Sequence, residues 1–430
     1  MPSSAPVIRS KPNGHKPEVP ISYDINLPYV DVDKQSRANT PYPHYLPTWD
    51  PMWFDPLPPF EYSDPALRVK GTSKPNLLGP DAKVNPIQPN IGSVVEGVQL
   101  NKLNDAGKDE LARLIAERKV LAFPDQDLID DGPAAQEAFM RYFGKPNYQP
   151  VSGSVRNHPA FHVIHRDGNR DEIARFLEAR TTTTLWHQDV SYEIQPPSYV
   201  MLGLLQGPEV GGDTVFAATD MAYKRLSPTL RSFLDTLKVR HSSAKMINHT
   251  RLVGGLVRKD PVDTIHPLVR VHPVTGEKCL FLNAEFVTKI EGMKEVEQKW
   301  LIDFLMNHVI TGHDFQARVR WQPRSIVMFD NRCTTRKWPP VNLNLELVLP
   351  PAISRLGCIL HFAFLFFLIF LCLQFSNSRW RMRDFLSDPP HLSDDLIVSE
   401  PLTNVPMTQT PQSSITSMRN TAPKPGISSG

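Results

Sequence analysis

The chain has 430 residues, with 47 Lys and Arg against 45 Asp and Glu, so its formal net charge is +2. This balance argues against a dedicated nucleic-acid-binding protein, because such proteins usually carry a strong excess of basic residues. Hydrophobic residues make up 40% of the chain and aromatic residues 9%, which is enough for a sizeable core and excludes wholesale disorder. The length suits one large domain with extensions, or two domains.

The numbers of prolines and cysteines exclude further classes of protein. There are 42 prolines against 22 glycines, and the absence of a glycine repeat excludes collagen. The four cysteines are widely spaced and form no C-x-x-C pair: Cys279, Cys333, Cys358 and Cys372. This spacing favours a reducing compartment over a disulfide framework or a zinc knuckle. The first residues lack the apolar stretch of a secretory signal, so a cytoplasmic location is expected.

The first 87 residues divide into two parts by composition. Residues 1–40 are polar and proline-rich and show no period, which predicts a disordered tail. Residues 41–66 combine proline with many Tyr, Trp and Phe residues. Segment 41–87 is therefore predicted to be an extended arm whose rings pack onto a globular body. The alternative, a ligand segment for an SH3-type domain, would need basic residues that are absent from 41–66.

Residues 88–335 predict a globular domain that is mainly β with flanking helices. Short apolar runs between turn residues predict strands at 94–100, 120–123, 199–204, 268–271, 279–282 and 325–329. Helices are predicted over 108–118, after the N-cap pair Ser227-Pro228, and over 294–309. The last of these is expected to place one apolar set on a common face: Val296, Trp300, Leu301, Phe304 and Leu305. Many short strands with few helices favour a β-sandwich or jelly roll over a doubly wound sheet.

The composition changes abruptly after residue 335. Residues 356–378 form a run of 23 residues without Asp, Glu, Lys or Arg, and 356–375 is long enough to span a bilayer. Residues 336–383 are therefore set apart as an atypical segment. Residues 384–430 are polar and rich in Pro, Ser and Thr, so they are predicted to be a disordered tail.

Two H-x-D motifs suggest metal chemistry. Non-haem Fe(II) oxygenases hold iron with two His and one carboxylate, and they leave the other positions open for a co-substrate and O₂. An H-x-D on a strand and its exit turn can supply two of the three ligands. The motif alone is weak, because about one match is expected from composition. The first match, His165-Arg166-Asp167, also spells a protein-kinase motif, but no DFG follows it. A surface or loop role is predicted for His165.

The second match, His187-Gln188-Asp189, has more favourable surroundings. Four threonines lead into it, Trp186 precedes it, and Gly211-Gly212-Asp213-Thr214 follows downstream. Paired glycines permit a tight turn with the backbone close to a ligand, and the Thr214 hydroxyl could bind a carboxylate. These residues alone leave two alternatives open: an iron site, or a hairpin turn that ends in a hydrogen-bonded threonine.

Longer stretches carry a family resemblance. They are PYPHYLPTWDP at 41–51, IGSVVEGVQLNKL at 91–103, ERKVLAFPDQD at 117–127, RYFGKP at 141–146, TTTTLWHQDVSYE at 181–193, PEVGGDTVFA at 208–217, HPLVRVHPVTGEKCLFLN at 266–283 and DFQARVRWQPRSIVMFDNRCT at 314–334. Over residues 41–335 the chain resembles the taurine/sulfonate dioxygenase family of Fe(II)/2-oxoglutarate enzymes, in its fungal sulfonate-dioxygenase-like branch. The resemblance implies a double-stranded β-helix, or jelly roll. It also implies Fe(II) bound by His187 and Asp189, and 2-oxoglutarate contacted by Thr214.

The same resemblance implies a reaction and a substrate class. The expected reaction is hydroxylation of a small sulfonate or related acid by O₂, with release of succinate and CO₂. Gln149 stands where the bacterial taurine enzymes have a sulfonate-contacting His, and Phe286 corresponds to a residue of the substrate pocket. Glutamine donates a hydrogen bond but carries no charge, so taurine itself is not implied. No nucleic-acid partner is expected, and a homo-oligomer is left open.

The resemblance breaks at residue 336. The family motif reads D-N-R-x-T-x-H, and its His is the distal iron ligand, but this chain has Arg336 at that position. A guanidinium stays protonated and does not ligate iron. The family Arg that pairs with 2-oxoglutarate lies about eleven residues later, where this chain has Leu347. We therefore expect a jelly roll that is incomplete at its C-terminal strands, and a chain that is catalytically poor or inactive.

Three explanations of this break are open. A gene-model or splicing artefact is favoured by the abrupt change within one motif. A genuine variant could attach to a membrane through 356–375, and a downstream His361 or His391 could complete the ligand set. The functional alternatives to an active dioxygenase are a pseudoenzyme that keeps the fold for binding and a membrane-anchored variant.

Overall fold

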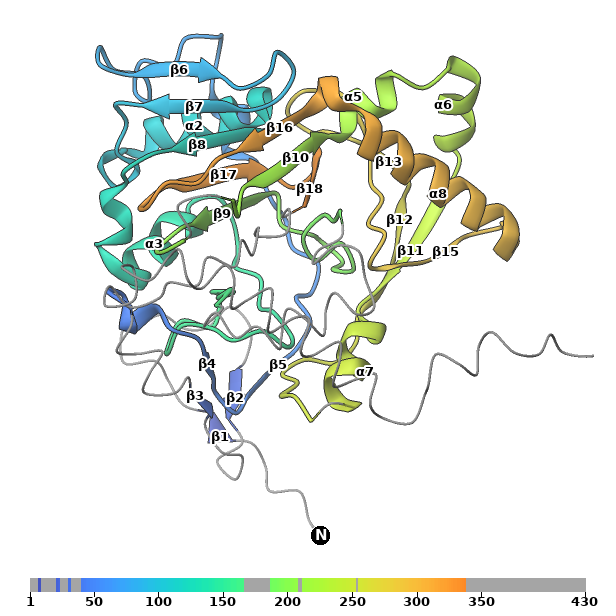
Figure 1. The fold of residues 1–430 in the computed structure, drawn as a ribbon, viewed down its shortest axis with the longest axis horizontal. Helices are drawn as coiled ribbons and strands as arrows, with labels where there is room; N and C mark the ends of the chain where they lie inside the picture. The colour runs from blue at the N-terminus through green and yellow to red at the C-terminus, as the bar shows by residue number, and fades with distance from the viewer. Residues whose placement is uncertain are drawn as a thin grey trace, which may run out of the picture. The chain divides into compact units, whose positions relative to one another are not determined.

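The structure is a computed structural model that describes residues 40–165, 186–207, 211–252 and 254–337, with the backbone of three short strands before residue 32 (Figure 1). Contacts divide the chain into two units, Met1–Glu346 and Leu347–Gly430. The described residues all belong to the first unit. The predictions for 338–430, including Leu347, the apolar run, His361 and His391, lie outside the described residues. The threonine run before Leu185 also lies outside them.

A five-stranded sheet forms one layer of the fold, in the order β6-β7-β8-β17-β9. Its strands are β6 (Lys83–Pro86), β7 (Ser93–Glu96), β8 (Val120–Phe123), β9 (Tyr199–Gly203) and β17 (Ile326–Asp330). Only the β7–β8 pair is parallel. The strands predicted at 120–123, 199–204 and 325–329 are confirmed, with the small end shifts that are usual for strand boundaries.

A three-stranded sheet, in the order β16-β10-β18, packs against the first sheet. It consists of β10 (Thr214–Ala218), β16 (Gln316–Val319) and β18 (Thr334–Lys337). Phe216 of β10 meets Phe329 of β17 with ring centroids 5.2 Å apart. Val120 and Val327 of the first sheet join the same buried cluster. The core therefore lies between two mainly antiparallel sheets, as predicted for a jelly roll.

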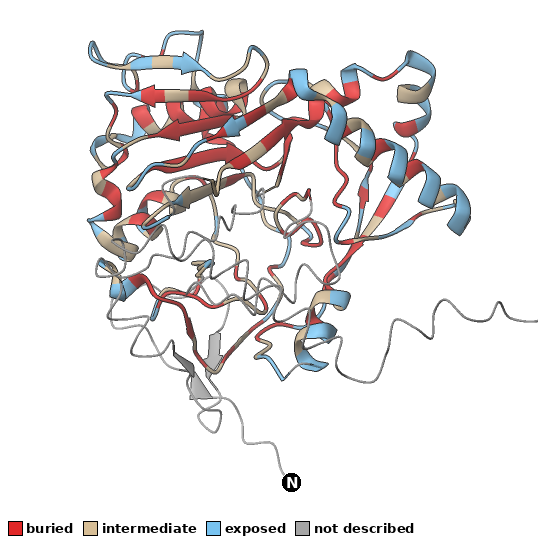
Figure 2. Ribbon diagram, in the orientation of Figure 1, coloured by how far each residue is buried: buried red, intermediate tan, exposed pale blue. Residues whose placement is uncertain are grey.

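The five-stranded sheet is buried on both faces. Leu121 and Met328, which alternate with the residues that face the second sheet, belong to a separate core cluster. Helices α2 (Asp105–Arg118) and α3 (Gly132–Arg141) contribute Leu111 and Phe139 to that cluster. Figure 2 shows β8 and β17 fully buried and the edge strand β6 largely exposed. The predicted helix at 108–118 is confirmed, and it begins slightly earlier because Asn104 caps it by accepting a hydrogen bond from the Gly107 backbone N–H.

The remaining elements flank this sandwich. A sheet of order β12-β11-β15 contains β11 (Lys238–Ser242), β12 (Asp263–Pro267) and β15 (Val287–Ile290), and β13 (Val269–Val271) forms a hairpin with β14 (Lys278–Leu280). The helices here are α5 (Thr219–Lys224), α6 (Pro228–Leu234), α7 (Ala244–Leu252) and α8 (Glu295–Thr311). Ser227 caps α6 as predicted, because its hydroxyl accepts a hydrogen bond from the Leu230 backbone N–H.

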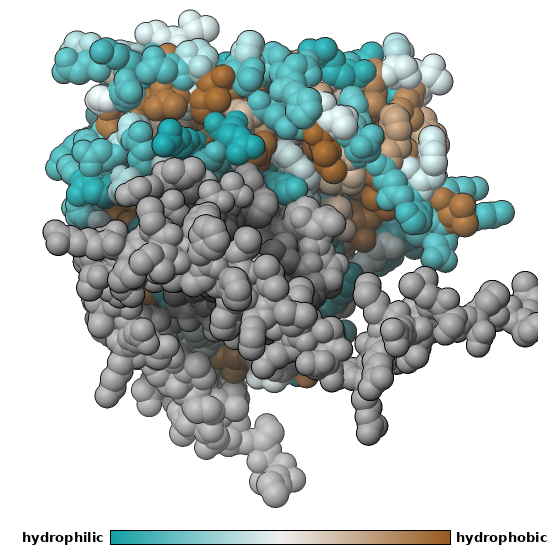
Figure 3. Space-filling model, viewed as in Figure 1, coloured by the Kyte–Doolittle hydropathy of each residue, from teal (hydrophilic) through white to brown (hydrophobic). Residues whose placement is uncertain are grey.

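The predicted apolar face of α8 is partly wrong. Leu301 and Leu305 are buried, but Val296 is 81% exposed, Trp300 64% and Phe304 38%. Apolar residues occupy two adjacent stripes of this helix, so periodicity alone could not tell which stripe meets the core. Figure 3 shows hydrophobic residues at the surface on the side of the molecule that carries α8.

The N-terminal arm lies against the sandwich through several short elements. These are η1 (Pro43–Tyr45), β4 (Thr48–Trp49), β5 (Met52–Phe54) and η2 (Pro65–Arg68). Three strands from earlier in the chain join them. Strand β3 (Val30–Asp31) pairs with β4, and β2 (Ile21–Tyr23) pairs with both β5 and β1 (Val7–Ile8). Phe54 packs on Tyr148 with ring centroids 5.2 Å apart. The hydroxyl of Tyr45 donates to the Ile129 carbonyl at 2.7 Å. Aromatic side chains therefore attach this segment to the body.

Among the described residues, no helix combines the length and the apolar character that crossing a membrane requires.

Candidate active site

Strand register places the predicted site residues on one face. His187 and Arg336 form an antiparallel bridge in which each backbone N–H donates to the other's carbonyl, at 3.0 and 2.9 Å. Arg336 lies opposite Phe216 across β18 and β10. Opposed residues share a face of a sheet, as do residues two apart on a strand. His187, Arg336, Phe216 and Thr214 therefore face the same interior.

The structure brings the first two predicted metal ligands together. Nε2 of His187 lies 3.5 Å from Oδ1 of Asp189, and both side chains keep some exposure, 20% and 16%. Trp186, just before them, is buried in the main core. Val190, just after them, has a φ of +41°, which is uncommon for a β-branched residue and marks a firmly held turn.

Asn331 holds this turn through its carboxamide. Its Oδ1 accepts from the Asp189 backbone N–H at 2.8 Å, and its Nδ2 donates to the carbonyls of Asp189 at 3.0 Å and Pro197 at 3.1 Å. The side chain is only 1% exposed, so water cannot replace these bonds. Asn331 therefore fixes the backbone from which the Asp189 carboxylate projects.

We expect Asn331→Ala to loosen the Asp189 turn and to lower the free energy of unfolding by about 2–3 kcal/mol, since three buried hydrogen bonds are lost. Hydrogen exchange should accelerate in the peptide that spans 187–193. Gln195→Ala is the matched control, because the Gln195 amide also bonds a backbone both ways, at Phe60, away from this turn. Faster exchange at 187–193 in both variants would contradict a specific role for Asn331.

Arg336 occupies the position expected for the third ligand and pairs with the carboxylate. Its NH2 donates to Oδ1 of Asp189 at 2.7 Å, and its guanidinium lies 5.4 Å from the centre of the Phe329 ring. Burial acts to raise the pKa of Asp189, but the Arg336 charge and the His187 contact outweigh it and hold this pKa well below its usual range. The carboxylate therefore stays ionised, with a guanidinium as its counter-ion.

His162, which no sequence motif singled out, lies within electrostatic reach of Asp189, His187 and Arg336. The residue as a whole is exposed, but lost hydration of its imidazole lowers the pKa of His162 to about 4, although the Asp189 charge acts to raise it. Its position depends on the packing of a loop, which sequence spacing does not reveal.

The donor set present does not fit a two-histidine, one-carboxylate metal site. A guanidinium hydrogen already lies on Asp189 Oδ1, the same carboxylate oxygen that lies 3.5 Å from His187 Nε2. Within the described ranges, the single cluster of three potential ligands whose donor atoms lie within 4.8 Å of one another is His272, Asp330 and Cys333. His162 therefore does not complete a set with His187 and Asp189. Only two of the three expected donors converge here.

The His272 cluster is itself a hydrogen-bonded salt bridge. His272 Nε2 lies 2.9 Å from Asp330 Oδ2, while its Nδ1 accepts from the backbone N–H groups of Val274 and Thr275. Nε2 must therefore carry a proton, which leaves no lone pair for a metal. Arg332 binds both oxygens of Asp330, at 2.8 and 2.6 Å.

The salt-bridge network extends to the N-terminal arm. Arg332 also donates through NH1 to Asp64, whose other oxygen accepts from the Tyr199 hydroxyl at 2.7 Å. Asp64 is 3% exposed. Sequence reasoning missed this connection, although Asp330 and Arg332 flank Asn331 in the D-N-R motif. The arm thus braces the turn that leads into β18.

The residues predicted to contact 2-oxoglutarate and the substrate are Thr214, Phe286 and Gln149. Thr214 is fully buried, and its Oγ1 accepts from Trp321 Nε1 at 2.9 Å, which leaves its own proton available for an acceptor. Phe286 packs edge-to-face on Tyr192 at 4.8 Å and belongs to a cluster with Val190, close to the Asp189 turn. Gln149 is half-buried, and its backbone carbonyl accepts from Arg258 NH2 at 3.3 Å.

Comparison with known proteins identifies the lineage. Residues 83–335 match the family model described as "Taurine catabolism dioxygenase TauD, TfdA family". The chain belongs to this family. The match ends one residue before Arg336, where the sequence departs from the family motif.

Curated relatives agree with the TauD/TfdA assignment. The chain is 44% identical over 308 residues to an alpha-ketoglutarate-dependent sulfonate dioxygenase of Saccharomyces cerevisiae, covering 70% of this chain and 74% of that protein. It is 38% identical over 309 residues to the alpha-ketoglutarate-dependent dioxygenase cnsM of Penicillium expansum, with 70% and 86% covered. A putative alpha-ketoglutarate-dependent sulfonate dioxygenase of Schizosaccharomyces pombe is 34% identical over 316 residues, with 71% and 77% covered.

The family predicted from sequence is therefore confirmed. TauD/TfdA enzymes are alpha-ketoglutarate-dependent dioxygenases, and membership implies 2-oxoglutarate, O₂, a metal and a small-molecule substrate. At position 336, where the family motif has a histidine, this chain has Arg336 instead.

Proposed function

We propose that this chain has the architecture of an organosulfonate dioxygenase but that, with the sequence as it stands, it does not retain catalytic iron. The names of the two yeast relatives support a small sulfonate, or a related acid, as the substrate class. In this proposal His187 and Asp189 are the remaining Fe(II) ligands and Thr214 is the 2-oxoglutarate contact. A cytoplasmic location is part of the proposal, and it is supported by the scattered cysteines.

The observation that carries the proposal is the 2.7 Å contact between Arg336 NH2 and Asp189 Oδ1. A divalent ion on Asp189 would lie beside this fixed positive charge. Two unit charges at 4 Å repel by about 4 kcal/mol at an effective dielectric constant of about 20, and a doubly charged ion is repelled roughly twice as strongly. The described residues therefore supply one ligand too few and an opposing charge as well.

The proposed substrate class is also supported by the side chains around the turn at Asp189. Val190 and Tyr192, which follow Asp189 in the chain, form an apolar cluster with Phe286, which supports a substrate with an organic rather than a purely ionic body. Gln149 would add a neutral hydrogen-bond donor for the acidic group. This combination suits a sulfonate with an apolar tail better than a small zwitterion.

The test is an anaerobic Fe(II) titration of the full chain, followed by measurement of succinate formed from 2-oxoglutarate without substrate. We expect substoichiometric iron and little succinate, because a ligand is missing and a cation opposes the metal. The S. cerevisiae relative, treated identically, is the positive control. Full iron loading with brisk turnover would refute the proposal. Calorimetric binding of 2-oxoglutarate without iron would identify a binding pseudoenzyme, and carbonate extraction would identify a membrane-anchored form.

A further inference from the structure

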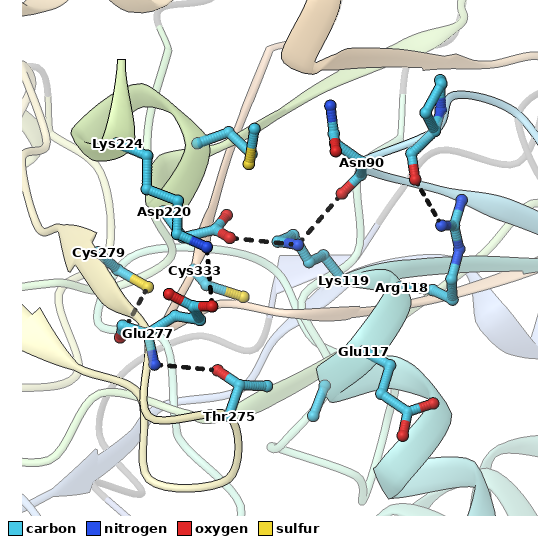
Figure 4. A pocket seen from close by; sticks show the side chains of 13 residues that line it. Asn90, Glu117, Arg118, Lys119, Asp220, Lys224, Thr275, Glu277, Cys279 and Cys333 are labelled. Carbon is cyan, nitrogen blue, oxygen red and sulfur yellow. Dashed lines mark hydrogen bonds and ion pairs between the residues drawn. The ribbon is translucent and has the colours of Figure 1, made fainter. Parts of the chain in front are cut away.

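A cavity of about 270 Å³ lies outside the candidate active site. Figure 4 shows Cys279, from β14, and Cys333, from the turn between β17 and β18, among the side chains that line it. Lys119 and Asp220 line the cavity as well, with Nζ and Oδ2 3.4 Å apart. Two thiols from distant parts of the chain thus open into one small polar space.

Both thiols are buried and lie next to each other. Cys279 and Cys333 are 1% and 2% exposed. Their Sγ atoms make long contacts to the carbonyls of Glu277 at 3.7 Å and Asp330 at 3.9 Å, and Cys333 also interacts with the His272 ring. Contacts of this length are weak, so small side-chain rotations can reorient either sulfur. The Cys279 thiol also contacts Cys333, and together with burial this contact raises the pKa of Cys333 well above its ordinary value.

Two exposed charged side chains of the cavity lining give a small polar molecule a route to the sulfurs. Lys224 and Glu277 line the cavity and form a 2.7 Å ion pair, with side chains 39% and 43% exposed. An ion pair of this exposure is weak and opens readily. The thiols are therefore shielded from large reagents but accessible to one of the size of hydrogen peroxide.

We propose that Cys279 and Cys333 form a reversible redox pair that hydrogen peroxide converts into a disulfide. The Cys279 sulfur attacks one peroxide oxygen and the O–O bond breaks; the sulfur becomes a sulfenic acid, and the departing hydroxide takes the Cys279 thiol proton and leaves as water. The Cys333 sulfur then attacks the Cys279 sulfur and forms the S–S bond, and the hydroxide of the sulfenic acid takes the Cys333 thiol proton and leaves as the second water. Two thiols lose two electrons and two protons, and one peroxide becomes two waters.

The two cysteines have different roles in this proposal. Burial and the Cys279 contact favour the protonated form of Cys333, so Cys279 makes the first attack, and Cys333 acts second by giving up its thiol proton to the departing hydroxide. Its position next to Arg332 gives the disulfide a structural consequence, because the bond would tie β14 to the turn that contains Asn331. Oxidation would therefore stiffen the segment that holds Asp189.

The test uses the full chain with Cys358→Ser and Cys372→Ser, which leaves the proposed pair as the remaining thiols. The folded protein is treated with hydrogen peroxide, alkylated, digested and analysed by mass spectrometry. We expect a linked peptide pair that is two hydrogens lighter than the separate peptides and that reductant separates. Adding Cys333→Ser should leave a sulfenic acid on Cys279 that dimedone traps, whereas adding Cys279→Ser should leave Cys333 unreacted. Thiols that stay reduced, or that oxidise separately to sulfinic acid, would overturn the proposal.

A second comparison tests the access route. Glu277→Ala removes the exposed Lys224–Glu277 ion pair of the cavity lining and should accelerate disulfide formation several-fold. Lys278→Ala is the matched control, because it removes the exposed 2.7 Å pair with Asp235 and does not line the cavity. Equal acceleration in both variants would show that oxidation follows general loosening of the fold, and would overturn entry through this cavity.

Discussion

Arg336→His should turn a site that repels a divalent metal into one that binds it. The change removes the guanidinium 2.7 Å from Asp189 Oδ1 and places an imidazole on the residue that is bridged to His187. Because one ligand is gained and one opposing charge is lost, we expect at least about a 100-fold gain in affinity for Fe(II) or Mn(II). An anaerobic titration, with the spectrum of bound Mn(II), measures this without turnover.

Arg336→Gln separates the two contributions. Glutamine removes the charge but offers no imidazole nitrogen, so its affinity should lie between those of the parent chain and Arg336→His. Adding Asp189→Ala to Arg336→His should abolish the gain. If Arg336→His binds metal no better than Arg336→Gln, residue 336 does not face the His187–Asp189 pair in solution, and the proposed cause of iron loss is wrong.

Sequence reasoning located the pair but not its counter-ion. The two-residue spacing of His187 and Asp189 is a local feature, so the motif was sufficient to predict that they meet. The family motif also identified position 336 as altered. That the Arg336 guanidinium turns back onto Asp189 depends on the bridge to His187, which joins residues far apart in the chain and has no sequence signature.

The sequence predicted helices and strands correctly where neighbouring residues alone determine the structure. The N-cap at Ser227 and the apolar run of β8 were sufficient to predict the helix and the strand there. It failed where tertiary packing decides, as for Trp300 on α8, which is 64% exposed although its spacing fits a buried stripe. The aromatic content of the arm predicted its packing onto the body. Its ion pair with the D-N-R motif, from Asp64 to Arg332, could not be predicted because charge complementarity across the chain is not periodic.

Asp330→Ala should be the most destabilising single change in the site. Asp330 is fully buried and accepts hydrogen bonds from His272 and from Arg332, at 2.9, 2.8 and 2.6 Å. Removing it leaves the buried His272 N–H without an acceptor and the Arg332 guanidinium with Asp64 as its remaining carboxylate partner, which costs about 3–5 kcal/mol of unfolding free energy. Asp303→Ala is the surface control. Its side chain is 63% exposed in a pair with Lys299, so its loss should cost less than about 1 kcal/mol.

The pH dependence of that loss tests the charge state of His272. Burial acts to lower the pKa of His272 and Asp330 acts to raise it, but the backbone N–H groups of Val274 and Thr275 donate to Nδ1, and a protonated Nδ1 could not accept these bonds. The ring is therefore neutral, and the charge pair of this core is Asp330 with Arg332. We expect the difference in unfolding free energy between the parent chain and Asp330→Asn, measured in urea, to stay constant between pH 6.5 and 9.5. If His272 were instead a cation whose folded pKa of about 9 lies above the unfolded value of about 6.5, its stabilisation would be complete below about pH 6.5 and lost as pH rises through 9. The difference would then shrink by about 3 kcal/mol over this range, and the assignment of the proton to Nε2 alone would be wrong.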